Sequence, residues 1–562
     1  MDATKTIIEA VGKMRQRRTS PLMLELDLTE GLTDAPPADP VSALLSMRRA
    51  RLSDVIGGLR RARRDPRVKG LIVKIGGHPL GLAMVQEIRN AVVHFRAAGK
   101  LTVAWADSYG EVANGTVPYY LASAFEKVYL QPSGDVGLTG VAIEQRFLKG
   151  ALGKLDIDYQ VGQRHQYKTA ANMFTQDHMT DAHKEMTGRL AESLTEQLVA
   201  GIAEGRGLEP KRVRELIDQG PFYGQEAVAA GLVDGLKYRD EVYADHVPEE
   251  TVLLYVARYA KTALPKMPHP GEQVVALVHG HGAIRLGRSG RSPLGGGSAM
   301  GSDTISAAIR AARRDDKVRA IVFRVDSPGG SYTASDSIWR EVILAKRAGK
   351  PVIVSMGDVA ASGGYFVSMA ADVIYAQPGT LTGSIGVFGG KAVLGGLLDR
   401  LGIATEIVAE GANAGMFSAT RPFSDSQWAR INTWLDRVYD DFVDKVAEGR
   451  GMERDRAESL ARGRVWTGSD ARDNGLVDEL GGVEDALAEA RKRAGLAADA
   501  PVRSYPKINP LERLIPPESS EDKTAAMARV RLEAWGPLAA FAAELGLPAA
   551  GPLVLPGQWV IR

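Results

Sequence analysis

Short apolar runs alternate with longer segments whose apolar residues recur at helical spacing, and this order appears twice along the chain. The runs lie at 22–26, 71–73, 102–104, 274–278, 321–323 and 352–354, and all but the first contain β-branched residues. Runs of this kind separated by helical patterns indicate βαβ units, in which helices cover a parallel sheet. The pattern therefore predicts an α/β fold whose buried strands carry the core.

Several short motifs recur at a nearly constant spacing, which indicates two copies of one design. Arg-Arg-Asp at 63–65 returns at 313–315, and Ala-Gly-Lys at 98–100 returns at 348–350, both 250 residues later. Gly-Leu-Val-Asp at 231–234 returns at 475–478, a spacing of 244. Because the spacing drifts so little, each copy contains few insertions, and we expect each copy to fold as one unit.

Composition shifts along the chain suggest where these copies begin and end. A Pro-bounded segment at 264–270 separates them, and a polar stretch at 516–522 precedes an apolar tail. We expect an amphipathic segment at 1–20, a first repeat at 21–262, a linker at 263–271, a second repeat at 272–497 and a C-terminal extension at 498–562.

The bulk composition is that of a globular protein. Of the 562 residues, 44% are hydrophobic and 25% are charged. The 70 basic and 68 acidic residues leave a formal charge of +2, so nothing suggests a nucleic-acid partner. The chain has no cysteine, which excludes a thiol nucleophile, a disulfide framework and a cysteine metal site.

The sequence offers no membrane-spanning signal. No apolar run approaches the ~18 residues that a spanning helix needs, and residues 1–20 lack the apolar part of a secretory signal. We therefore expect a cytoplasmic protein. Apolar side chains of the tail, such as Trp535 and Phe541, leave open a peripheral attachment at the inner face of the membrane.

The two copies differ at the residues that could carry chemistry. The second has Ala-Ala-Ser-Gly-Gly at 360–364, where the first has Asn-Gly-Thr-Val-Pro. The first has Tyr-Lys-Thr at 167–169, where the second has Met-Phe-Ser. One copy keeps a serine, Ser362, and the other keeps a lysine, Lys168, as expected of a composite active site that arose by duplication.

Ser362 lies where a predicted strand meets an apolar helix, among small neighbours that let a carbonyl group approach. An N-cap serine with a purely structural role would fit the same motif. However, Asp-Ser-Pro-Gly-Gly at 326–330 follows the strand 321–325, at the carboxyl end where parallel sheets bind ligands. The backbone N–H groups of Gly330 and Gly363 are therefore a plausible oxyanion hole.

A serine nucleophile needs a base, and we favour Lys168 for that role. A lysine removed from water can lose its proton far below its usual pKa of about 10.4 and then accept a proton from the serine. Ser384 could orient the amine. His165, close to Lys168 in sequence, is the fallback base, and a solvated lysine with no chemical role is the alternative.

The sequence predicts neither a metal nor a cofactor. His279 and His281 would share one face of a strand, but no third ligand accompanies them. No phosphate-binding motif of the form G-x-x-x-x-G-K-[ST] occurs.

Three motifs, at 326–331, 356–365 and 381–387, closely resemble the signal peptide peptidase A (protease IV) family in its long duplicated form. This resemblance extends over most of both repeats and implies two tandem Clp protease/crotonase-like repeats. It implies a Ser/Lys dyad of Ser362 and Lys168, with Ser384 orienting the lysine. It also assigns Gly330 and Gly363 to the oxyanion hole.

The resemblance further implies a serine endopeptidase that assembles as a homotetramer. Its substrates would be cleaved signal peptides and other short or unfolded peptides, and it would use no cofactor, metal or nucleic acid. The lysine motif departs slightly from the family pattern, since His-Gln-Tyr-Lys-Thr at 165–169 keeps only the tyrosine, the lysine and a hydroxyl. Many members carry an N-terminal membrane anchor, which we do not expect here.

Two other functions stay open. A crotonase-like enzyme acting on acyl thioesters shares the fold and the oxyanion chemistry but needs no serine nucleophile. A non-catalytic scaffold of the same fold needs neither Ser362 nor Lys168. An activated acyl probe that labels Ser362 would distinguish the peptidase from both.

Overall fold

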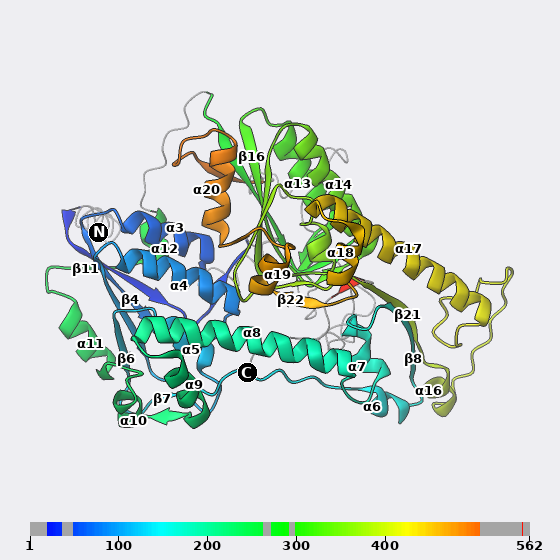
Figure 1. Cartoon of the computed structure of the whole chain (residues 1–562), viewed down its shortest axis with the longest axis horizontal. Coiled ribbons are helices and arrows are strands. Elements are labelled where there is room, and N and C mark those ends of the chain that lie inside the picture. Colours follow the sequence, from blue (N-terminus) through cyan, green and yellow to red (C-terminus); the bar gives the residue numbers. More distant parts are fainter. Residues whose placement is uncertain (1–18, 36–48, 262–270, 292–297, 506–552, 555–562) are drawn as a thin grey trace, which may run out of the picture. The chain divides into compact units, whose positions relative to one another are not determined.

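The structure is a computed structural model that describes residues 19–35, 49–261, 271–291, 298–505 and 553–554 (Figure 1). Nearly all of the expected amphipathic segment at 1–20, and most of the linker and of the C-terminal extension, lie outside these residues. Within the described ranges, no helix is both long and apolar enough to cross a membrane.

The chain forms two compact units, and their division does not follow the repeats. Unit 1 consists mainly of residues 1–142 and 194–269, and unit 2 consists of residues 143–193 and 270–561. A segment of the first repeat, 143–193, therefore belongs to the unit that the second repeat builds. The long helix α8, Asp181–Arg206, continues along the chain from this segment into unit 1.

Unit 1 is built on a parallel sheet with the strand order β10-β6-β5-β4-β1-β11. These strands are β1 (Leu22–Asp27), β4 (Val68–Lys74), β5 (Leu101–Ala106), β6 (Lys127–Leu130), β10 (Gly235–Leu236) and β11 (Val252–Tyr255). The described helices of this unit include α3 (Leu52–Ala62), α4 (Leu82–Arg96), α5 (Thr116–Ala122), α9 (Pro210–Gln219), α10 (Gln225–Ala229), α11 (Arg239–His246) and α12 (Val256–Lys261). Short strand pairs join β2 (Leu32–Thr33) to β3 (Ala50–Arg51) and β7 (Asp135–Val136) to β9 (Phe222–Tyr223).

Unit 2 repeats this sheet and extends it. Its strands are β12 (Val274–His281), β16 (Val318–Ser327), β18 (Val352–Ala361), β19 (Val373–Ala376), β20 (Leu381–Gly383), β22 (Val465–Thr467), β23 (Glu479–Leu480) and β24 (Val502–Tyr505). Its helices include α13 (Ser302–Arg314), α14 (Tyr332–Arg347), α15 (Gly363–Phe366), α17 (Asp425–Arg450), α18 (Arg454–Leu460), α19 (Gly468–Asn474) and α20 (Val483–Arg493). The order β24-β12-β16-β18-β19-β23 matches β11-β1-β4-β5-β6-β10 strand for strand. The predicted tandem α/β repeats are therefore confirmed.

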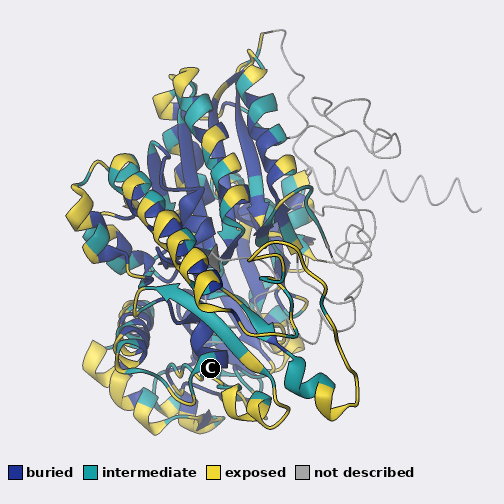
Figure 2. Ribbon diagram, turned by 90° about the vertical axis from the view of Figure 1, so that its right-hand side faces the viewer, coloured by how far each residue is buried: buried dark blue, intermediate teal, exposed yellow. Residues whose placement is uncertain are grey.

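Helices cover both faces of the unit 2 sheet, which explains why its strands are apolar almost throughout. Successive residues of a strand face opposite sides. Val322 and Ile353 pack in one cluster with Leu487 of α20, whereas Phe323 and Val354 belong to the larger cluster that includes α13, α14 and α17. Figure 1 shows α20 on one side of β16 and α13 with α14 on the other, and Figure 2 shows the strands buried between helices whose outer surfaces are exposed.

Several repeated motifs of the sequence have structural roles. The lysine of Ala-Gly-Lys closes the turn after Arg-Arg-Asp in both repeats: Lys350 Nζ donates to the carbonyls of Ala312 and Asp315, as Lys100 Nζ does to Asp65 and Val68. The aspartate of Gly-Leu-Val-Asp pairs with an arginine of the long helix in each case, Asp234 with Arg206 and Asp478 with Arg450. These motifs recur because they stabilise the fold.

The segment 143–193 joins the rest of unit 2 through an antiparallel strand pair. β8 (Asp158–Arg164) pairs with β21 (Val387–Val393) over its whole length. Flanking elements are α6 (Lys149–Gly153), the 3₁₀ turn η1 (Thr169–Ala171), α7 (Asn172–Thr175) and α16 (Gly395–Arg400). Lys168 lies just beyond the end of β8, so this ribbon brings a residue of the first repeat into unit 2.

Candidate active site

The structure brings together the serine and the lysine that the sequence singled out. Lys168 Nζ lies 2.7 Å from Ser362 Oγ. The same nitrogen donates to the Ser384 carbonyl at 2.8 Å and lies 3.0 Å from Ser384 Oγ. All three residues belong to unit 2, and the predicted grouping of Lys168, Ser362 and Ser384 is present in the structure.

The amine of Lys168 is removed from solvent. Lys168, Ser362 and Ser384 each have 0% of their surface exposed. Burial lowers the pKa of Lys168 well below its usual value, and in the part of the chain that the structure describes no carboxylate opposes this effect. The site therefore favours the neutral amine, the form that can accept a proton.

Ser362 has an unusual backbone conformation that aims its side chain. It follows β18 and precedes the short helix α15, with φ 55° and ψ −114°. A positive φ is costly for a residue with a Cβ and persists only where the surroundings fix it. Here Ser362 N–H donates to the Gly383 carbonyl at 2.7 Å, and the Ser362 carbonyl accepts from Phe366 N–H at 2.8 Å.

Gly330 and Gly363 lie against each other beside Ser362. A Cβ placed on Gly363 would be 3.0 Å from Gly330 N and 2.8 Å from Ser335 Oγ, so no side chain fits there. Gly330 belongs to the two-residue strand β17 (Gly329–Gly330), and its φ is 156°. One edge of β17 pairs with β13 (Ala283–Arg285), and the other pairs antiparallel with β25 (Leu553–Val554). The second edge can therefore hold an extended chain.

This arrangement has the parts that acyl transfer requires. A neutral amine next to a hydroxyl can take its proton, which makes the oxygen a nucleophile. Backbone N–H groups beside the same hydroxyl can stabilise the negative charge that develops on a carbonyl oxygen.

His165 and His281 contact groups other than Ser362 and Lys168. His165 is 43% exposed at its side chain, packs edge-on against Tyr439 and lies 3.8 Å from Glu458. His281 Nδ1 lies 3.1 Å from Asp326 Oδ2. In the part of the chain that the structure describes, no three His, Asp or Glu side chains are grouped as a metal site would need.

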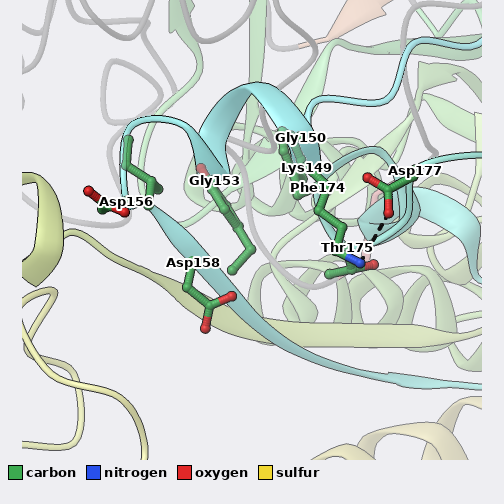
Figure 3. Close-up of a pocket in the computed structure, with 10 residues that line it drawn as sticks. Lys149, Gly150, Gly153, Asp156, Asp158, Phe174, Thr175 and Asp177 are labelled. Atoms are coloured by element: carbon green, nitrogen blue, oxygen red, sulfur yellow. Dashed lines mark ion pairs between the residues drawn. The ribbon is translucent and has the colours of Figure 1, made fainter.

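A separate pocket of 510 Å³ opens between α6 and β8 (Figure 3). Its lining includes Tyr159 and Phe174, whose rings are stacked 4.7 Å apart, and Lys149, which lies 3.3 Å from Asp177. Asp156 at its rim lies 3.1 Å from Arg400. None of the predicted site residues lines this pocket.

Comparison with known proteins shows to which family the chain belongs. The model of peptidase family S49 matches the chain twice, over residues 94–252 and 344–497. The chain belongs to peptidase family S49. One matched region lies in each repeat, which confirms that this S49 peptidase is of the duplicated type.

The chain is similar to proteins that are named as proteases. "Protease 4" of Salmonella typhi is 33% identical over 466 residues, which cover 79% of this chain and 72% of that protein. "Serine protease SPPA, chloroplastic" of Arabidopsis thaliana is 32% identical over 440 residues, 77% of this chain and 64% of that longer protein. Among solved structures, ClpP1 of Listeria monocytogenes is similar with 16% identity and a TM-score of 0.25, over 38% of this chain and 94% of that one.

The first repeat of this S49 peptidase has a threonine at the place that Ser362 has in the second repeat. Tyr119 and Tyr365 are equivalent, because each hydroxyl donates to the carbonyl of an equivalent leucine, Leu232 or Leu476. Counting back three residues, Thr116 occupies the place of Ser362. Thr116 Oγ1 accepts from backbone N–H groups of Thr139 and Gly140 at 3.2 and 3.0 Å, so it has a structural role.

Residues 462–464 bind the backbone on both sides of the lysine amine, next to Lys168 and at Ser384. The sequence did not indicate this role. The Arg462 carbonyl accepts from Tyr167 N–H at 3.1 Å, and the Arg464 carbonyl accepts from Ser384 N–H at 2.7 Å. Between them, Gly463 packs directly onto Lys168: a Cβ placed there would lie 2.3 Å from Lys168 N. No chemical motif marks this segment, so only the folded structure identifies it.

Tyr167, Glu185 and Arg464 brace the same loop from outside. The Tyr167 hydroxyl donates to Glu185 Oε2 at 2.6 Å, and Arg464 donates to Glu185 Oε1 at 2.8 Å. The Arg464 guanidinium also lies over the Tyr167 ring, 4.8 Å from its centre. Tyr167 thus anchors the backbone immediately before Lys168.

We expect Gly463→Ala to inactivate the enzyme by displacing Lys168. Its Cβ would collide with the Lys168 backbone, and its φ of +84° is strained for alanine. Gly451→Ala is the matched control, since Gly451 also has a positive φ, +60°, but no atom within 4 Å of the added Cβ. Peptidase activity and melting temperature are measured for both. Equal activity in the two variants would contradict this role of Gly463.

We expect Lys168→Met to change how stability depends on pH. Because the folded-state pKa of Lys168 is lowered, the unfolded chain binds more protons, and Lys168 lowers the stability of the folded protein at neutral pH. Stability of the wild type should therefore rise with pH between the lowered pKa and ~10.4, by up to about 1.4 kcal/mol per pH unit. Lys168→Met should be inactive but more stable at pH 6, with the difference shrinking as pH rises. Urea unfolding from pH 6 to 9.5 measures this, and parallel stability curves would contradict it.

Proposed function

We propose that this serine peptidase of the signal peptide peptidase type cleaves peptide bonds with Ser362 as nucleophile and Lys168 as general base. The observation that carries the proposal is the distance of 2.7 Å between Lys168 Nζ and Ser362 Oγ in a place without exposed surface. Removal from water lowers the pKa of Lys168, so the base is available at a lower pH than a solvated lysine would allow.

In the proposed reaction, the neutral amine of Lys168 takes the hydroxyl proton of Ser362 while Oγ attacks the scissile carbonyl carbon. The N–H groups of Gly330 and Gly363 stabilise the oxyanion of the tetrahedral intermediate. As the intermediate collapses, the C–N bond breaks and the Lys168 ammonium returns its proton to the leaving amine. Water, activated by the same amine, then hydrolyses the acyl-serine. Ser384 orients Lys168 through its carbonyl and its hydroxyl.

The substrates we propose are short or unfolded peptides, including signal-peptide-like sequences. The family supports a peptide substrate, and the antiparallel pairing of β17 with β25 supports an extended one, because it shows that this edge can hold an extended chain. A substrate strand would take the edge of β17 on which β25 lies in this structure, antiparallel to Gly329 and Gly330. Main-chain hydrogen bonds would then place its carbonyl group beside Ser362.

We expect Ser362→Ala to lower kcat by at least about 10³-fold without changing the melting temperature. Digestion of a peptide library, analysed by mass spectrometry, measures the activity. An acyl-serine adduct at Ser362, formed by a fluorophosphonate probe, separates a peptidase from a crotonase-like enzyme and from a scaffold. Activity above a tenth of wild type in Ser362→Ala would exclude Ser362 as nucleophile.

Lys168→Arg tests the base in the same assays. Arginine keeps a positive charge but does not lose its proton at working pH, so the variant should be as inactive as Lys168→Ala. In the wild type, activity should rise with pH through one ionisation, because the unprotonated amine is the base. Near-normal activity in Lys168→Arg would instead favour His165.

We further propose that the enzyme assembles from copies of this chain, as the tetramer that the family resemblance implies. β8 of the first repeat pairs with β21 of the second. Tyr119 and its equivalent Tyr365 are 246 residues apart. At this spacing the counterparts of the two strands are 404–410 and 141–147, and neither range is a strand in the described chain. Residues 404–410 of one copy could therefore pair with 141–147 of the next copy, in the same register.

The exposed apolar side chains support this contact. Val408 has a relative exposure of 101% and Phe417 of 79%, within a segment that also exposes Leu401 and Ile403. Clusters of this kind mark interaction surfaces. Because the two contact surfaces lie on different repeats, the interface is head-to-tail, and such an interface forms a ring when the rotation between copies closes.

We expect Val408→Glu to yield smaller assemblies than the wild type, because the carboxylate would be buried against the next copy. Size-exclusion chromatography with light scattering measures the mass. Val93→Glu is the control, since Val93 is a partly exposed apolar residue of α4, outside both segments. An unchanged mass in Val408→Glu would contradict the contact.

A further inference from the structure

The strand that leads to Ser362 contains a bulge, and Asp326 lies opposite it. β16 and β18 pair in parallel, with Val325 opposite Met356, but two residues later Ser327 is opposite Ala360. β18 therefore has two extra residues, between Met356 and Ala360. A bulge of this kind bends a strand and changes the direction of the side chains that follow it.

The carboxylate of Asp326 accepts a hydrogen bond from a backbone N–H group of the bulge. Its Oδ1 accepts from Val359 N–H at 3.1 Å, a backbone donor that the strand ladder leaves free at this point. Gly357 packs against the same group: a Cβ on Gly357 would lie 2.8 Å from Asp326 Cβ and 2.9 Å from its Cγ. The bulge therefore encloses this carboxylate closely.

Asp326 also forms hydrogen bonds with the end of β12. Its Oδ2 lies 3.1 Å from Nδ1 of His281, the last residue of β12, and its carbonyl accepts from Gly282 N–H at 2.9 Å. Burial by itself would raise the pKa of Asp326, but the hydrogen bonds from His281 and from Val359 N–H and the charges of His281 and Arg324 keep that pKa below its usual value. Asp326 thus joins the ends of β12, β16 and β18 as a carboxylate.

The position of Asp326 in the chain gives these contacts a functional meaning. Asp326 is four residues before Gly330, and Val359, its hydrogen-bond partner, is three residues before Ser362 and four before Gly363. One carboxylate therefore connects the two segments that carry the proposed oxyanion donors.

The first repeat is a natural comparison. At the repeat spacing of 250, the counterpart of Asp326 is Gly76, which has no carboxylate. The counterpart strand β5 ends at Ala106, whereas β18 continues past the equivalent residue, Met356, to Ala361. The extended strand that delivers a nucleophile is present in the copy that has the aspartate and absent from the copy that lacks it.

We propose that Asp326 is a positioning residue for the reaction: its carboxylate, held by His281, fixes the bulge of β18 and thereby the separation of the Gly330 and Gly363 N–H groups beside Ser362. This inference rests on the proposed peptidase function. Asp326 itself touches no reacting atom. Its removal should therefore weaken transition-state stabilisation without weakening peptide binding, which depends on the edge of β17.

The test compares Asp326→Ala with Asp326→Asn in the full-length enzyme. Asp326→Ala should lower kcat by about 10- to 100-fold, which is less than the ~10²- to 10³-fold loss on removal of an oxyanion donor because both N–H groups remain, with KM within about threefold of wild type. Asp326→Asn keeps an oxygen that can accept from Val359 N–H, so its kcat should stay within about fivefold of wild type. His281→Ala, which leaves the Val359 contact in place, should have an intermediate kcat.

Asp372→Ala is the matched control. Asp372 Oδ2 accepts from Val352 N–H at 2.8 Å, which is the same kind of contact at the opposite end of β18. Its loss should lower the melting temperature about as much as the loss of Asp326 but leave kcat near wild type. If Asp326→Ala does not fold, the kcat and KM of His281→Ala decide the question.

The rate constant for labelling of Ser362 by a fluorophosphonate separates the two proposals. If the wild type neither cleaves peptides nor is labelled, the proposed function fails. If the wild type is active but Asp326→Ala has kcat and labelling rate within twofold of it, the role of Asp326 is overturned. A fall in kcat as large in Asp372→Ala, or as large in Asp326→Asn as in Asp326→Ala, would also overturn it.

Discussion

The physical constraint on which the site depends is the removal of one amine from water. An ammonium ion is among the most costly groups to bury, and here Lys168 is buried with no carboxylate of the described residues paired to it. Its hydrogen-bond partners are two serine hydroxyls and one carbonyl, all neutral. The fold therefore stabilises the unprotonated form. The close packing of Gly463 on the Lys168 backbone and the hydrogen bonds of Tyr167 and Arg464 to Glu185 hold the lysine segment in this place.

Much of the fold and the centre of the site could be predicted from the sequence, because each leaves a local trace. Apolar runs of strand length indicated the parallel sheets, and the recurring motifs indicated the duplication. The serine and the lysine could be singled out because the copies differ there. The recurrence of Ala-Gly-Lys and Gly-Leu-Val-Asp had a different cause from the chemistry, since Lys350 and Asp478 stabilise turns and helix contacts.

The remaining parts of the site depend on contacts between segments far apart in sequence, which periodicity cannot reveal. Gly463 is 295 residues from Lys168 in the sequence, and only the fold packs it directly against the Lys168 backbone. The bulge opposite Asp326 appears only when the register of β16 and β18 is known. The assignment of 143–193 to unit 2 could not be predicted either, because the sequence repeat places this segment with the first copy. Repetition in sequence defines ancestry, whereas packing defines which residues share a core.

Because the segment 143–193 contains Lys168, the amine is synthesised well before the residues that bury it. Lys168 leaves the ribosome 194 residues ahead of Ser362, which at about 5–20 residues per second corresponds to roughly 10–40 s. During this interval the amine has neither its serine partners nor the glycine that covers it, so it remains in water and protonated. With Lys168 as the proposed base, a nascent chain has no active base during this interval. The proposed site is completed only when the second repeat has folded around β8, a strand that was synthesised long before it.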